Sequence, residues 1–132
     1  APRPLVDRQS AQWDPILAWA AETYDAPLRL SSGVLPSDQP AQALTGLRAA
    51  LDARAAWGMA GLSAAVDALG SLLLGLALAD RRLDAAAAFA AARVDEDWQR
   101  EQWGPDDEAD ARAAILRADV DAAAGFLNRL KA

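Results

Sequence analysis

Apolar residues recur at steps of three and four along most of the chain, which is the spacing of one face of an α-helix. The clearest example is the stretch 106–130, whose apolar positions are Ala109, Ala113, Leu116, Val120, Ala123, Leu127 and Leu130. Leu44, Leu47 and Leu51 form a shorter face of the same kind within residues 40–55. Both stretches are therefore predicted to be helices with one side turned to a core.

Residues 57–79 are apolar on nearly every side, which predicts one long helix in the centre of a bundle. Glycine weakens a helix, yet this stretch contains Gly58, Gly61, Gly70 and Gly75. We interpret these glycines as positions of close helix–helix packing.

Prolines divide the N-terminal part of the chain. Residues 5–12 are predicted to be helical, and Asp14 with Pro15 favours the start of a second helix that runs to Tyr24. Aspartate is a preferred cap, and proline is tolerated at the first helical position. One helix that is kinked at Pro15 is the alternative.

A proline-rich loop is predicted over residues 25–40, because Pro27, Gly33, Pro36 and Pro40 rule out a long helix there. The apolar residues of this loop could form a short extended piece, which is the one candidate strand. They are Leu28, Leu30, Val34 and Leu35.

Asp84 is predicted to cap a helix that begins at residue 85. If this helix ran on unbroken, Glu96 would lie on the same side as Phe89, at about 100° per residue. A carboxylate in the core is costly. We therefore predict a break near residues 94–95, with Asp95 capping a short helix.

Composition supports a helical fold. Of 132 residues, 35 are alanine, whereas only two are Thr, two Ile and five Val. Alanine is the best helix former and β-branched residues favour strands, so an all-β fold is excluded. We predict an all-α fold, a five- to six-helix bundle with one proline-rich loop, in a single helical domain over residues 1–132.

The residues that are missing exclude most enzyme chemistry. The chain has no Cys and no His, and its only Lys is Lys131. A cysteine nucleophile, a histidine base, an imidazole or thiolate metal site and a P-loop lysine are therefore ruled out or very hard to build. We predict a protein that is not an enzyme and needs no cofactor.

Charge and hydropathy narrow the choice of partner. The net charge of −6 leaves no basic patch for nucleic acid. The longest apolar run, residues 68–79, is shorter than the roughly 20 residues that cross a bilayer. We therefore expect neither nucleic-acid binding nor membrane insertion.

The run from Asp106 to Asp110 (DDEAD) matches the acidic pattern that binds magnesium in helical prenyl-transferring enzymes. That chemistry needs carboxylates that converge on one ion, a second acidic cluster and a large cavity. Acidic residues are also favoured at a helix start by the helix dipole alone. Both interpretations stay open at this point, and the helix start needs fewer assumptions.

Residues 95–104 combine three consecutive acids with two tryptophans, Trp98 and Trp103. Five residues apart on a helix, the two rings point about 140° away from each other. We therefore expect one of them in the core and the other near the surface. Tryptophan is among the commonest anchors of protein interfaces.

Four segments resemble one protein family, the assembly chaperones of the α subunit of the F-type ATP synthase catalytic head. They are residues 5–9 (LVDRQ), 13–20 (WDPILAWA), 33–36 (GVLP) and, most specifically, 95–104 (DEDWQREQWG). The resemblance extends over most of the chain, from about residue 5 to residue 130. Family members carry this helical part at their C-terminus, after a β-rich N-terminal domain, so we expect a fragment of a larger α+β protein.

The resemblance implies a chaperone that binds newly made α subunit, prevents its aggregation and releases it for assembly with the β subunit. It further implies that an acid in the helix ahead of the Trp-Gly pair is important, and either Asp95 or Glu96 fits that position. The expected partner-binding residues are Asp95, Glu96, Asp97, Trp98, Glu101 and Trp103. We expect a monomer in the bacterial cytoplasm, with eukaryotic relatives in the mitochondrial matrix.

Two other functional classes stay open. One is a helical adaptor whose partner is unrelated to ATP synthase. The other is a magnesium-dependent enzyme that uses Asp106, Asp107 and Asp110.

Overall fold

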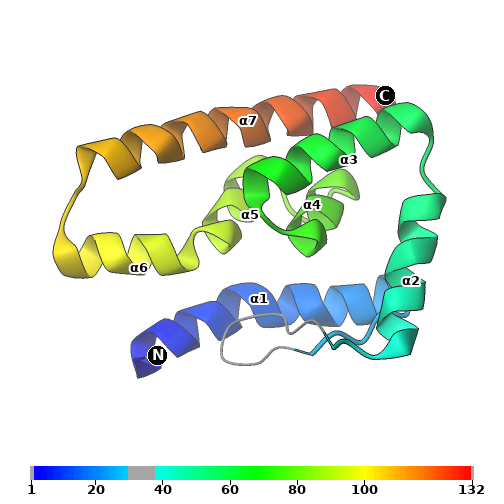
Figure 1. The fold of residues 1–132 in the computed structure, drawn as a ribbon, viewed down its shortest axis with the longest axis horizontal. Coiled ribbons are helices and arrows are strands. Elements are labelled where there is room, and N and C mark those ends of the chain that lie inside the picture. The colour runs from blue at the N-terminus through cyan, green and yellow to red at the C-terminus, as the bar shows by residue number, and fades with distance from the viewer. Residues whose placement is uncertain (1, 30–37, 132) are drawn as a thin grey trace. The chain divides into compact units, whose positions relative to one another are not determined.

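The computed structural model describes residues 2–29 and 38–131, and these residues form seven α-helices and no strand (Figure 1). The helices are α1 (Arg3–Tyr24), α2 (Ala41–Asp52), α3 (Ala56–Leu69), α4 (Leu72–Ala79), α5 (Ala85–Ala92), α6 (Val94–Trp103) and α7 (Asp107–Lys131). The all-α prediction is confirmed, with slightly more helices than predicted. The chain groups into two compact units, Ala1–Arg54 and Ala55–Ala132.

In the first unit, α1 is one helix that continues through Pro15, so the prediction of a new helix at that residue is wrong. Gln9, Ile16 and Ala20 are the buried residues of α1, at steps of seven and four. These steps lie on one side of a helix only if it runs unbroken. Burial of this face therefore offsets the one backbone hydrogen bond that the proline lacks.

Helix α2 packs against α1 within this unit. Its buried residue is Ala43, whereas Leu44 is exposed, which contradicts the prediction that Leu44 belongs to the core face. Gly46 explains the shift, because a Cβ there would collide with the carbonyl oxygen of Tyr24. The close approach of the end of α1 leaves room only for small residues on that side of α2.

The loop between α1 and α2 is irregular over residues 25–29 and 38–40. The side-chain amide of Gln39 accepts from the backbone N–H of Arg29 (2.8 Å) and donates to its carbonyl (2.9 Å). The predicted extended piece falls mostly on Leu30, Val34 and Leu35, which lie outside the described residues.

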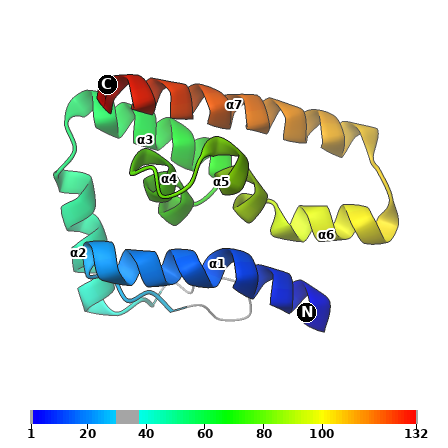
Figure 2. The same ribbon diagram turned by 180° about the vertical axis from the view of Figure 1, so that it is seen from behind.

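In the second unit, α3 and α7 lie side by side, and α4 and α5 pack beneath them (Figures 1 and 2). Every residue of α4 from Leu73 to Ala79 is buried. This confirms a central apolar helix. At Gly75 a Cβ would lie 2.6 Å from Cγ2 of Val66, and at Gly61 one would lie 2.6 Å from Cδ2 of Leu127. The prediction of close packing at these two glycines is therefore confirmed.

The predicted long helix 57–79 is wrong, because the chain turns between α3 and α4. Gly70 ends α3 in the left-handed conformation (φ 69°), and its N–H donates to the carbonyl of Val66 at 2.7 Å. Ser71 then caps α4 by accepting from the N–H of Leu74 at 3.1 Å. Only glycine adopts this φ without a steric penalty, so Gly70 is a turn residue.

Asp84 caps α5 as predicted, with its side chain 2.8 Å from the N–H of Ala87. The break that follows is also present, but Arg93 holds the cap position of α6 and Asp95 lies within the first turn. The prediction that Asp95 caps α6 is therefore wrong. Val94 is buried and Glu96 is exposed, so the break keeps the carboxylate out of the core, as the helical geometry required.

Candidate protein-interaction site

Helix α6 carries all six of the residues predicted to bind a partner. Asp95, Glu96 and Asp97 occupy its first turn, where the positive end of the helix dipole favours carboxylates. Arg100 lies in its last turn, where a cation is favoured. The helix ends at Gly104 (φ 91°), whose N–H donates to the carbonyl of Arg100 at 2.9 Å.

The packing of α6 is sparse. Val94 is its one buried residue, and among the described helices of the second unit none packs closely against it. Figures 1 and 2 both show α6 extending away from α3, α4 and α5 before the chain turns into α7. The exposed side chains of α6 that a partner can contact include Glu96, Asp97 and Trp103.

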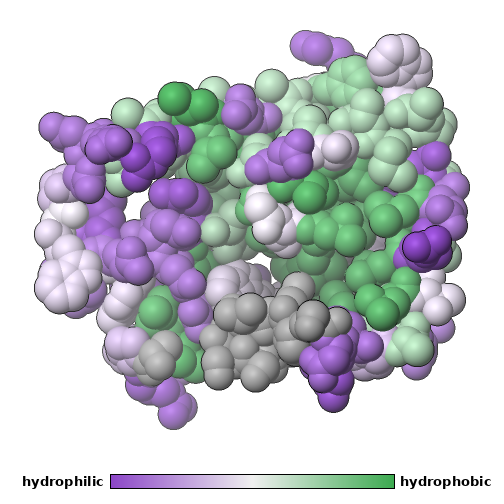
Figure 3. Space-filling model, in the orientation of Figure 1, coloured by the Kyte–Doolittle hydropathy of each residue, from purple (hydrophilic) through white to green (hydrophobic). Residues whose placement is uncertain are grey.

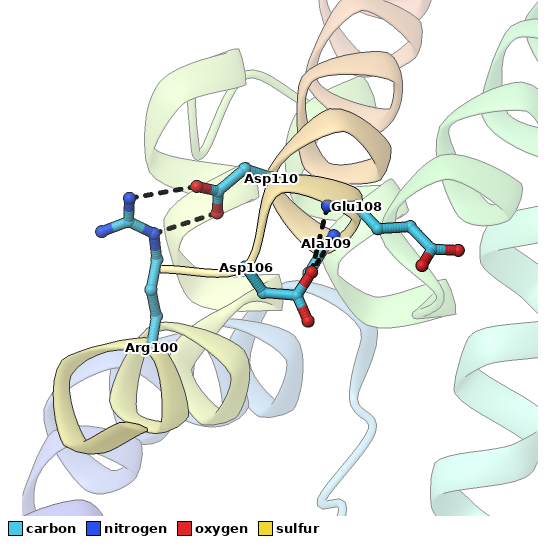
Figure 4. Close-up of polar contacts among 5 residues, drawn as sticks. All are labelled: Arg100, Asp106, Glu108, Ala109 and Asp110. Atoms are coloured by element: carbon cyan, nitrogen blue, oxygen red, sulfur yellow. Dashed lines mark hydrogen bonds and ion pairs between the residues drawn. The ribbon is translucent and has the colours of Figure 1, made fainter. Parts of the chain in front are cut away.

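One ion pair ties α6 to α7. Nε and Nη2 of Arg100 donate to the two carboxylate oxygens of Asp110 at 3.0 and 3.1 Å (Figure 4). This bond lowers the pKa of Asp110 below its usual value and raises the pKa of Arg100. The guanidinium group fits a carboxylate through two parallel bonds, so the pair fixes orientation as well as distance.

The neighbouring acids serve the start of α7. Asp106 accepts from the N–H groups of Glu108 (3.0 Å) and Ala109 (3.1 Å), which makes it the cap of this helix (Figure 4). Glu108 pairs with Arg112 at 3.3 Å. Asp110 faces Arg100, so these carboxylates do not converge on one point. Where the chain is described, no three acidic side chains are grouped to hold a metal ion.

The two tryptophans of α6 have different environments, as their angular separation predicts. Trp103 is 85% exposed, whereas Trp98 is half-buried rather than fully in the core. Glu96, Asp97 and Glu101 are exposed and Asp95 is half-buried. The structure therefore places exposed acids and one exposed aromatic ring on the same ten-residue helix.

Sequence reasoning missed a second exposed aromatic residue. Trp57 is 70% exposed, and its ring packs edge to face on the ring of Phe126, with 6.5 Å between the ring centroids. A signal was present in the sequence, because Trp57 is about 140° from the apolar stripe that begins at Leu62.

In the described parts of the chain, no helix combines the length and the apolar character needed to cross a membrane.

No model of a known protein family matches the sequence. Solved structures do match. Atp12 from Paracoccus denitrificans is 41% identical, with a TM-score of 0.90 over 97% of this chain and 55% of that protein. A variant of the same Paracoccus protein, with one aspartate replaced by lysine, gives a TM-score of 0.91 at the same identity and the same coverage.

A third structure, described as a candidate chaperone from Agrobacterium tumefaciens, is 37% identical, with a TM-score of 0.82 over 96% of this chain and 47% of that protein. The chain thus spans about half the length of the proteins that it matches. High identity and the same helical arrangement extend over almost all of the chain, which therefore belongs to the Atp12 family.

Proposed function

We propose that the chain is part of an assembly chaperone that binds the α subunit of the ATP synthase catalytic head. In this role it prevents aggregation of the α subunit and releases it for assembly with the β subunit. The observation that carries the proposal is the likeness to Atp12, at 41% identity over 97% of the chain. The name of the Agrobacterium structure also supports a chaperone role over an enzymatic one.

The proposed binding site is α6, through Asp95, Glu96, Asp97, Trp98, Glu101 and Trp103. An exposed tryptophan supplies large contact area at little entropic cost, and it is a frequent energetic anchor of interfaces. The acids around it would favour a basic rim on the client and raise the rate of association.

The client's chemistry suits such a site. A subunit that has not yet met its neighbours exposes apolar surface and is prone to aggregate. Trp103, which is 85% exposed, would cover part of that surface, while the acids of α6 would keep the complex soluble. Release would follow when the β subunit competes for the same surface.

Charge reversal of the acids tests the site. Asp95→Lys combined with Glu96→Lys is expected to abolish co-elution with freshly refolded α subunit on a sizing column, with the β subunit as the negative control. The matched control is Glu22→Lys with Asp52→Lys, which makes the same change in net charge at exposed positions of α1 and α2. Circular dichroism should show equal helicity in both variants.

Asp95 is half-buried and Glu96 is exposed, so the two acids differ in how easily a client reaches them. Comparing the binding of the Asp95→Lys and Glu96→Lys single variants decides which acid matters more. Undiminished binding by the Asp95/Glu96 double variant would remove α6 as the site. No complex between the wild-type chain and the α subunit would overturn the proposed client, and an adaptor for another protein would then be the better hypothesis. We also propose that the protein is monomeric and cytoplasmic, which light scattering and cell fractionation would test.

A further inference from the structure

A groove of about 540 Å³ runs between α3 and α7 on the surface of the second unit. Its floor is made of small residues, among them Ala64 of α3 and Ala122 of α7, both of which are exposed. Figure 3 shows mostly pale green, apolar surface over the region where α3 and the later part of α7 lie in Figure 1, and purple, hydrophilic surface over the start of α7. At 1.5 Å per residue, the lining positions of α3 span about 12 Å, or a little over two turns.

The floor is smooth because the two helices approach closely. A Cβ at Gly61 would lie 2.6 Å from Cδ2 of Leu127 and 2.9 Å from Cδ2 of Phe126, both on α7. Six of the ten residues that line the groove are glycine or alanine, so short side chains keep most of the space between the helices open. A shallow groove that is lined mainly by small residues is the kind of surface on which a third helix packs.

The two ends of the groove differ in chemistry. The helices are antiparallel, with the start of α3 beside the end of α7 (Figures 1 and 2). Phe126 and the exposed ring of Trp57 meet at this end. Asp67 and Asp119 line the other end.

The acidic end is suited to a cation. Within the described ranges neither Asp67 nor Asp119 makes a hydrogen bond or an ion pair, so both carboxylates are available. Asp67 also lies in the last turn of α3, where the negative end of the helix dipole adds to its charge. Lining residues of α3 contribute no positive charge to this end.

We propose that this groove docks an amphipathic α-helix of a partner protein, with a Lys or Arg beside Asp67 and Asp119. Small and medium apolar side chains of that helix lie along the alanine floor, and a large apolar side chain packs on Trp57 and Phe126. The groove is separate from α6 in sequence. The inference therefore goes beyond the proposed function and does not depend on the client of α6.

The test uses a fluorescein-labelled synthetic peptide of about 18 residues, enough for five turns. It carries Leu and Ala on one face, two Arg at one end of that face and Gln elsewhere. The chain is expected to bind it, with a blue shift of its tryptophan emission, and more weakly as salt rises. A second peptide with Glu in place of the two Arg is expected to bind at least tenfold more weakly.

Variants then locate the binding. Ala122→Leu fills the groove and should weaken binding at least tenfold, whereas Ala118→Leu, also exposed on α7 but outside the groove, should not. Asp67→Lys with Asp119→Lys should abolish the preference for Arg over Glu. The double variant Glu22→Lys with Asp52→Lys makes the same change in net charge and is the control for the Asp67/Asp119 double variant.

Three outcomes would overturn the proposal: no binding of the Arg peptide, equal binding of both peptides, or equal binding by the Ala122 and Ala118 variants. Self-association of the chain that Ala122→Leu disrupts would also overturn it, since the occupant would then be a second copy. Failure of these tests leaves the α-subunit experiment on α6 unaffected.

Discussion

At the scale of single residues, the Arg100–Asp110 pair leads to a prediction about how the stability of the fold depends on pH. Its two hydrogen bonds favour the ionised carboxylate, so the pKa of Asp110 lies below its ordinary value of 3.8. A carboxyl group whose pKa is lower in the native state than in the unfolded chain stabilises the fold at pH values above its ordinary pKa. This stabilisation is lost as the pH falls through the lower, native pKa. We predict that Arg100→Gln raises the pKa of Asp110, as followed by NMR titration of its carboxyl carbon. An identical titration in both proteins would show that the pair does not form in solution.

Substitution of two helical glycines by alanine is expected to change the stability of the fold in opposite directions. Gly46→Ala drives a Cβ into the backbone carbonyl of Tyr24, and overpacking of this kind costs about 1–3 kcal/mol. Gly125→Ala meets nothing within 4 Å, so its better helix propensity should raise stability by up to about 1 kcal/mol. Urea denaturation measures both. Equal effects of the two substitutions would show that the contact at Gly46 is absent.

The candidate site was predictable residue by residue only where one helix decides. The difference in exposure between Trp98 and Trp103 follows from their angular separation within α6, which the sequence alone supplies, whereas the angle does not say which of the two rings is exposed. The hydrogen bond from Arg100 to Asp110 could not be predicted in this way, because it spans a turn whose course depends on the backbone of Gly104 (φ 91°). Sequence spacing carries no such information.

At the scale of elements, the sequence predicted helix existence better than helix boundaries. Residues on both sides of Gly70 are apolar at the same period, so the pattern cannot show that the chain turns there. At Pro15 the opposite error arose, because a local breaker was overruled by a continuous buried face at Ile16 and Ala20. Tertiary packing, which decides both cases, depends on partners distant in the sequence.

The contrast between α4 and α6 leads to a prediction about local stability. Nearly all of α4 is buried, whereas α6 buries Val94 alone. Amide hydrogens exchange through local opening, which is easiest where few apolar contacts are lost. We expect the amides of α6 to exchange fastest among the helices of the second unit and those of α4 slowest, by mass spectrometry. Slow exchange throughout α6 in the free chain would mean that this helix is covered, and would count against it as the docking element.

At the scale of the whole molecule, alanine content and the lack of β-branched residues were enough to predict the fold class. The grouping into two compact units was not predicted, because it depends on which helices meet across long sequence separations. The single domain expected from the length of 132 residues stays a prediction. A single domain should unfold in one cooperative transition, and two separate transitions in calorimetry would contradict it.

The two units differ in how much apolar volume they bury, and this leads to a prediction about fragments. In its described part, unit Ala1–Arg54 buries one large aliphatic side chain, Ile16. Unit Ala55–Ala132 buries nine, namely Leu62, Leu69, Leu73, Leu74, Leu76, Leu78, Val94, Val120 and Leu127. Small chains with few such side chains rarely fold alone. We therefore expect a peptide of residues 55–132 to keep its helicity and melt cooperatively by circular dichroism, whereas a peptide of residues 1–54 should show little helix. Cooperative melting of the 1–54 peptide would mean that α1 and α2 stabilise each other without a larger core.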